Sequence, residues 1–142
     1  MTGLRPSQSS YRLPHAAAVP PGLRPGQELL TVTTQPVPGG AVVLGVRGEV
    51  DLCTSPLLRD GLLAHLRQAS VPLVIDLTDV SFFAAAGLTV LVTARQAAVT
   101  AGIGLCVVAN SRPVLLPLTI TGLDRVLDIH PDLADALLCL SG

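Results

Sequence analysis

The sequence lacks tryptophan and has only one tyrosine and two phenylalanines, although apolar residues make up 49% of its 142 positions. A core must therefore be packed from Leu, Val, Ile and Ala, and the length suits one domain rather than two. Lysine is also absent, and the net charge is −1 with no run of basic residues. A chain without a basic patch lacks the electrostatic footprint of a nucleic-acid-binding protein.

Cysteine is scarce as well, with Cys53, Cys106 and Cys139 at unrelated spacings. An odd number so arranged predicts neither a disulfide framework nor a metal site, and it favours a reduced, cytoplasmic compartment. The N-terminus has no basic region followed by an apolar core, so no signal peptide is expected. The longest nearly apolar stretch, residues 82–94, is shorter than the ~20 residues that a membrane span requires. We therefore expect a cytoplasmic protein that has no contact with a membrane.

The chain divides into two parts. Residues 1–27 contain five prolines and no periodic apolar pattern, which predicts a disordered tail. Residues 28–142 alternate between strand-like and helix-like patterns, and we assign them to one folded domain. Strands are expected at 28–37, 41–50, 71–77, 103–109 and 126–129, and helices from Pro56 through about Leu66, at about 85–101, at 111–122 and from Pro131 onward. This order predicts an α/β domain with a mixed, mostly parallel sheet of about five strands and about four helices.

Local signals support these elements. Pro38–Gly40 supplies the turn of a hairpin, Thr54 or Ser55 can cap the first helix ahead of Pro56, and Ser111 can cap the third. Pro117 lies inside the third helix and is expected to kink it or to loosen its first turn. The buried stripes are expected at Leu58, Leu62 and Leu66, at Leu88, Leu91, Val92, Ala98 and Val99, and at Leu133, Leu137 and Leu140.

Catalytic groups are few. His15, His65 and His130 show no triad pattern, and the glycines form no phosphate-binding loop. Asp76 and Asp79 flank an expected turn, where they could pair as acid and base or hold a cation, but ending the strand is the simpler role. Cys106 lies in mid-strand, where an inert buried thiol is the default. The sequence favours a binding module over an enzyme and predicts no cofactor.

The stretch from Asp76 to Leu91 is the natural functional centre. An apolar strand runs into an expected polar turn, an aromatic segment follows, and a helix then begins at three alanines and a glycine. Small residues at a strand-to-helix junction allow another backbone to approach closely.

Four sequence blocks stand out within about residues 41–130: Gly48–Leu52 with Thr54 and Pro56, Leu73–Leu77, Val80–Phe82 through Gly87 and Leu88, and Thr121–Asp124. In this order and spacing they make the chain resemble the STAS family, which includes bacterial anti-sigma factor antagonists and the cytoplasmic domains of sulfate transporters. The resemblance implies the STAS fold.

In the antagonist branch, an Asp-Ser-Ser motif precedes the Gly-Leu pair, and its first serine is phosphorylated by the anti-sigma factor, an ATP-using kinase. The unphosphorylated antagonist binds that kinase and frees the sigma factor. This chain has Ala84, Ala85 and Ala86 there, so the phosphorylation position, Ala85, has no hydroxyl. The resemblance therefore implies constitutive binding of an anti-sigma-type kinase. The residues it assigns to this contact are Ala84, Ala85, Ala86, Gly87, Thr89 and Val90.

Other interpretations stay open. Ser81 and Thr89 are the nearest hydroxyls to the missing serine, and a structural role is favoured for both. Leu115 and Leu116 are unlikely to be buried together and mark a possible second interface, against ordinary packing around a kinked helix. The chain could instead be a small-ligand or nucleotide sensor with the alanine loop as a pocket rim. A third alternative is a scaffold subunit that assembles with other STAS proteins or with itself.

Overall fold

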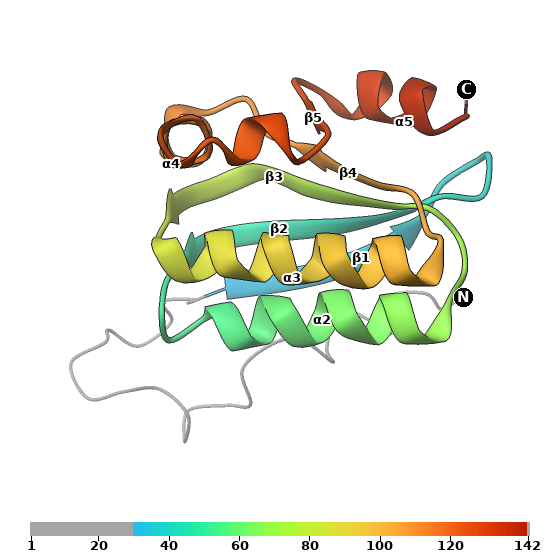
Figure 1. Ribbon diagram of the computed structural model, residues 1–142, viewed down its shortest axis with the longest axis horizontal. Coiled ribbons are helices and arrows are strands. Elements are labelled where there is room, and N and C mark those ends of the chain that lie inside the picture. Colours follow the sequence, from blue (N-terminus) through green and yellow to red (C-terminus); the bar gives the residue numbers. More distant parts are fainter. Residues whose placement is uncertain (1–29, 142) are drawn as a thin grey trace.

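A computed structural model describes residues 30–141, which form one five-stranded sheet with helices on both faces (Figure 1). The strands are β1 (Leu30–Pro36), β2 (Val42–Val50), β3 (Leu73–Phe83), β4 (Leu105–Val108) and β5 (Ile129–His130). The helices are α2 (Ser55–Gln68), α3 (Ala85–Ala101), α4 (Arg112–Thr121) and α5 (Leu133–Ser141), with the short 3-10 helix η2 (Leu123–Arg125). The tail predicted at residues 1–27 lies outside the described residues.

The strands lie in the order β1-β2-β3-β4-β5. β1 and β2 form an antiparallel hairpin, and every later neighbour is parallel. The hairpin turns at Gly39 and Gly40, whose φ angles of 102° and 100° favour glycine because a side chain would be strained there. The predicted fold class, a mixed and mostly parallel sheet with four helices, is confirmed.

The two faces of the sheet are covered unequally. Leu73, Ile75 and Leu77 of β3 join the larger apolar cluster, to which α2, α3 and α4 contribute. Val74, between them, joins a smaller cluster on the opposite face with Ala136 of α5. Figure 1 shows α2 and α3 side by side on one side of the sheet and α5 on the other. Burial on both faces explains why this part of β3 is a continuous apolar run.

β3 continues to Phe83, so the polar turn expected after Leu77 is wrong. Thr78 and Asp79 remain in the strand, where a register shift against β2 between Asp76 and Asp79 accommodates them, and a second shift follows between Val80 and Phe82. Asp76 is the last β3 residue paired with β4, and its Oδ1 accepts hydrogen bonds from the Thr78 backbone N–H (3.1 Å) and Oγ1 (2.8 Å). Polar side chains are tolerated here because β3 has lost its neighbour on one side. Asp76 and Asp79 therefore do not flank a turn.

The start of α2 is organised by Asp51 rather than by a capping side chain of Thr54 or Ser55. Asp51 Oδ1 accepts the backbone N–H groups of Cys53 and Thr54, both at 2.9 Å. The buried Thr54 hydroxyl donates to Glu49 O at 2.7 Å and accepts from the Asp51 N–H at 2.9 Å. These bonds explain the Asp and Thr of the first sequence block. Ser111 occupies the N-cap position of α4, but its hydroxyl also makes no capping bond.

Some predicted details differ from the structure. Val99 is 66% exposed, and Ala94 is buried in the core face of α3 instead. The edge strand is shorter than predicted, because Val126 and Leu127 precede β5. Ala136 is the buried residue of α5, and its predicted leucines pack as partly buried neighbours. Within residues 30–141, none of the helices combines the length and apolar character needed to cross a bilayer.

Candidate functional site

The junction between β3 and α3 is tied to the end of β2. Ala84 is the N-cap of α3 in an extended conformation, and its N–H donates to Val50 O at 2.8 Å. Its carbonyl accepts from the Gly87 N–H at 2.9 Å, which closes the first turn of the helix. Alanine offers no capping side chain, so this end of α3 has no side-chain cap. The backbone of the alanine segment is thus positioned by main-chain bonds alone.

Gly87 serves internal packing. A Cβ built on this residue would lie 2.8 Å from both Phe83 Cζ and Val50 Cγ1, closer than real Cβ contacts. Val90 is also buried. Gly87 has no side chain and the side chain of Val90 is buried, so neither presents side-chain surface to a partner, and their place in the partner-binding set stays a prediction. The close approach predicted at the glycine is made by the chain's own Phe83 and Val50.

The other predicted residues remain accessible to differing degrees. Ala85 and Thr89 are exposed, and Ala84 and Ala86 are half-buried. Thr89 Oγ1 donates to Ala85 O at 3.3 Å, within the first turns of the helix. The structure therefore brings Ala85 and Thr89 together on one accessible face at the start of α3.

Phe82 and Leu52 are exposed apolar residues near the junction that the sequence analysis did not include in the predicted site. Phe82 is 51% exposed whereas Phe83 is buried, and Leu52, in the connection from β2 to α2, is 80% exposed. Val50 pairs with Phe83, so the connections that follow β2 and β3 leave the sheet at the same end of these strands, as Figure 1 shows. The sequence Phe82-Phe83 could have indicated this exposure, because adjacent residues of a strand point to opposite faces and one of the two rings is then exposed if the other is buried. We call Leu52, Phe82, Ala85 and Thr89 the junction surface.

The junction surface is small, apolar and without a charged side chain of its own. No acidic residue lies in the first turn of α3, so the partial positive charge of the helix N-terminus has no anionic side chain there to offset it. Ser81 is nearby and exposed, and its Oγ donates to Gly48 O at 3.4 Å. Such a surface is suited to binding another protein and supplies no catalytic group.

Leu115 and Leu116, predicted as a possible second interface, differ in their exposure. Leu115 is partly buried against the core, whereas Leu116 is 41% exposed, with the exposed Ile120 one turn further along α4. The expectation that both leucines are not buried together is therefore correct. α4 continues through Pro117 as one helix.

Two surface hollows lie away from the alanine segment. One, of about 140 Å³, lies between α3 and residues 126–128. The other, of about 220 Å³, is polar and is lined by Thr31, Thr33, Gly45, Val46, Arg47, Asp76 and Asp79. Because neither includes Ala84–Ala86, neither supports the alanine loop as a pocket rim. His65 is distant from both, and its Nε2 lies 3.4 Å from Val71 O; His15 is outside the described residues.

A separate cluster brings together Cys106, Asp128, His130 and Cys139, whose candidate ligand atoms all lie within 4.8 Å of one another. Burial opposes the charged form of His130, but the neighbouring carboxylates of Asp135 and Asp128 outweigh this and raise its pKa. Sequence reasoning considered Cys106 and His130 singly. It found no cluster because these residues come from separate elements at irregular spacing.

The fold agrees with the comparisons to known proteins. A family model for the STAS domain matches residues 33–136, and the chain belongs to this family. It is 31% identical over 103 residues to the anti-sigma-F factor antagonist RsfB of Mycobacterium tuberculosis, covering 72% of this chain and 84% of RsfB.

Solved structures show the same relationship. The crystal structure of an anti-sigma factor antagonist from Mycobacterium paratuberculosis matches with a TM-score of 0.71 at 29% identity, covering 84% of this chain and 98% of that one. The anti-sigma factor antagonist SpoIIAA in its unphosphorylated form matches with a TM-score of 0.61 at 15% identity, covering 75% and 92%. The second likeness concerns the fold alone. The resemblance inferred from the sequence blocks is confirmed.

Proposed function

We propose that this chain is a non-catalytic antagonist that binds an anti-sigma factor through the junction surface, without a serine phosphorylation switch. The similarity to RsfB, whose name describes an antagonist of the anti-sigma-F factor, carries the choice of partner. We choose this surface because Ala85, at the position of the missing serine, is exposed at the start of α3.

The absence of a switch follows from chemistry at one position. A phosphate adds about −2 charge and three acceptor oxygens. The positive end of a helix dipole accommodates such a group, and its bulk and charge would repel a partner docked there. Ala85 has no hydroxyl to accept a phosphate, so binding through this surface is constitutive. In this proposal the protein's effect depends on its concentration.

The junction surface also has the composition of a binding centre. Phe82 and Leu52 are large, exposed and apolar, and aromatic anchors are frequent at the centres of protein interfaces. Ala85 and Thr89, at the start of α3, have small exposed side chains that let a partner approach the backbone of this helix. Burial of Phe82 and Leu52 by the partner supplies affinity, and the alanine segment supplies close fit.

The test uses Ala85→Glu, which places a charge where a phosphoserine would lie. Ala85 is exposed in the first turn of α3, where an acidic side chain is favourable by about 0.3–1 kcal/mol, so the fold is expected to stay intact. Gln96→Glu is the matched control. It adds the same charge at an exposed position of the same helix, about 16 Å along its axis.

The anti-sigma factor is first isolated from lysate of the source bacterium on the immobilised wild-type chain, identified by mass spectrometry and then purified. Isothermal titration then compares the wild type with both variants. We expect Ala85→Glu to weaken binding by about tenfold or more and Gln96→Glu to leave it unchanged. Equal affinity of Ala85→Glu and wild type would contradict the surface, and failure to retain any anti-sigma factor would contradict the partner.

A further inference from the structure

The cluster beneath α5 joins four elements that are far apart in the sequence. Cys106 lies on β4, Asp128 precedes β5, His130 lies on β5 and Cys139 lies on α5. Both thiols donate to the same oxygen, Asp128 Oδ2, from Cys106 at 3.3 Å and from Cys139 at 3.5 Å. His130 Nε2 lies 3.1 Å from the other oxygen, Oδ1. The Asp128 carboxylate thus contacts two sulfur atoms and one imidazole nitrogen.

These separations are close to the edges of a tetrahedral metal site. Zinc binds sulfur at about 2.3 Å and nitrogen or oxygen at about 2.0–2.2 Å. The edges of a tetrahedron are about 1.63 times the bond length, so neighbouring ligand atoms lie about 3.3–3.8 Å apart. The two Sγ–Oδ2 separations, 3.3 and 3.5 Å, fall within this range. The 3.1 Å separation of His130 Nε2 is to the other Asp128 oxygen, Oδ1. Small side-chain adjustments would bring the remaining pairs, all within 4.8 Å, to the same spacing.

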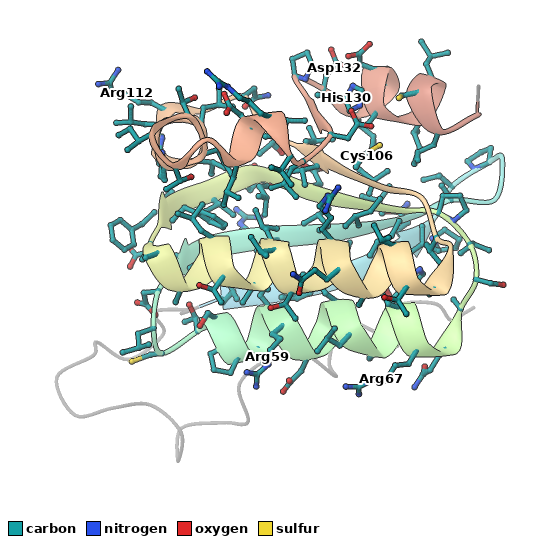
Figure 2. All side chains as sticks on the ribbon, viewed as in Figure 1. Arg59, Arg67, Cys106, Arg112, His130 and Asp132 are labelled. Carbon is teal, nitrogen blue, oxygen red and sulfur yellow. The ribbon has the colours of Figure 1, made fainter. Side chains whose placement is uncertain are left out.

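His130 is oriented as a metal-binding histidine is. Its Nδ1 lies 3.1 Å from Asp135 Oδ2. Asp135 is itself positioned because its backbone N–H donates to Asp132 Oδ1 at 2.8 Å. A carboxylate on one ring nitrogen sets the tautomer that presents the other nitrogen's lone pair to a metal. Figure 2 shows Cys106, His130 and Asp132 close together beside α5.

The second ring nitrogen has no hydrogen bond to satisfy it. His130 Nε2 is buried and no hydrogen bond satisfies it among the described residues, although it lies 3.1 Å from Asp128 Oδ1 as an ion-pair contact. A buried polar atom without a partner is costly. A cation bound between Nε2 and the Asp128 carboxylate would satisfy both.

Without a cation, the Asp128 carboxylate favours the protonated form of both thiols. Burial raises the pKa of the Cys106 thiol to about 12, and the hydrogen bond to Asp128 and its negative charge act in the same direction. The Asp128 carboxylate likewise raises the pKa of Cys139. A bound divalent cation reverses this effect, because it stabilises a coordinating thiolate directly.

We propose that Cys106, Asp128, His130 and Cys139 bind one zinc-class divalent cation, with Asp135 as the residue that positions His130. Two sulfurs, one imidazole and one carboxylate form a tetrahedral donor set typical of zinc. Asp128 and Cys139 are exposed, so an ion can enter from solvent, whereas Cys106 anchors the site on the sheet. Four protein ligands leave no open position, so the site is structural and fastens α5 to β4 and β5. The cysteine spacing alone predicts no such site, and this proposal departs from that expectation.

The test is titration of the full-length, metal-free protein with Co²⁺ under a phosphine reductant that keeps the thiols reduced. We expect one Co²⁺ per chain, with thiolate-to-cobalt charge-transfer absorption and the intense visible bands of tetrahedral cobalt, both abolished by added Zn²⁺. Cys106→Ser and Cys139→Ser should each reduce the charge-transfer absorption. Each should also weaken Co²⁺ affinity by at least about 100-fold, because losing a metal ligand costs more than the 10–100-fold lost with a residue that only orients a ligand. Cys53→Ser, which changes an exposed cysteine outside the cluster, is the matched control and should bind as wild type does.

Two further variants separate coordination from folding. Asp128→Asn changes a side chain that is half exposed and should abolish tight binding while the metal-free protein keeps its thermal midpoint. Asp135→Asn should weaken Co²⁺ affinity by about 10–100-fold and keep the charge-transfer bands, because it is not a ligand. Absence of charge-transfer absorption in the wild type would overturn the proposal. Wild-type affinity in both Cys106→Ser and Cys139→Ser would overturn it as well.

Discussion

Replacement of Gly87 by alanine tests whether this glycine packs the core or leaves room for a partner. The added Cβ would lie 2.8 Å from Phe83 Cζ, 2.8 Å from Val50 Cγ1 and 2.9 Å from Phe83 Cε1. Phe83 and Val50 are both buried in the main core, so neither side chain can move aside into solvent. The methyl group must therefore shift the start of α3 away from β2 or displace two core side chains.

Overpacking and helix propensity have opposite effects on the stability of Gly87→Ala. Overpacking of a core position typically costs about 1–3 kcal/mol, and contact with two separate side chains places Gly87→Ala near the upper end. Alanine is the better helix former by about 1 kcal/mol. We expect a net loss of about 2 kcal/mol in the free energy of unfolding, or roughly 8 °C in the thermal midpoint.

The assay is urea and thermal unfolding followed by circular dichroism. Phe83→Leu serves as a second background, because it removes the ring atoms Cε1 and Cζ that the new methyl group would meet. Gly87→Ala should cost less in that background, and the difference measures the coupling between the two positions. If Gly87→Ala instead raised stability by about 1 kcal/mol, helix propensity would be the governing term and the packing argument would be refuted.

Two further substitutions test local features of the fold by thermal unfolding. Thr54→Val removes a buried hydroxyl bonded to Glu49 O and the Asp51 N–H and should cost about 2–3 kcal/mol; a neutral result would mean that the turn does not depend on it. Gly122→Ala should cost about 1–2 kcal/mol through backbone strain alone, because φ is 79° and no atom would lie within 4 Å of the added Cβ. Stabilisation by Gly122→Ala would contradict that reasoning.

Most of the fold was predictable because its signals are local. The continuous apolar run at residues 73–77 indicates a strand covered on both faces, and Gly102 and Gly122 end helices in the left-handed conformation that glycine favours. The order of strands and helices then restricts the topology, since parallel neighbours need helical crossovers. The extension of β3 to Phe83 was not predictable from these signals, because register shifts let polar residues remain in a strand.

The candidate site was predictable as a segment but not residue by residue. The alanine segment and Ala85 were located from the sequence blocks, and the structure places Ala85 on the surface. Burial of Val90 and exposure of Phe82 depend on how α3 and β3 meet β2, which helical periodicity does not specify.

The sequence by itself determined the class of fold, its family and the absence of a hydroxyl at Ala85, because these depend on residue type and order along the chain. Only the tertiary structure decided that Gly87 packs inside, while Leu52 and Phe82 are both exposed near the end of the sheet where β2 and β3 stop. Only it brought Cys106 and Cys139 to the same carboxylate oxygen. The physical reason is that parallel strands and crossover helices join distant segments at one place, and no local pattern records which side chains then meet.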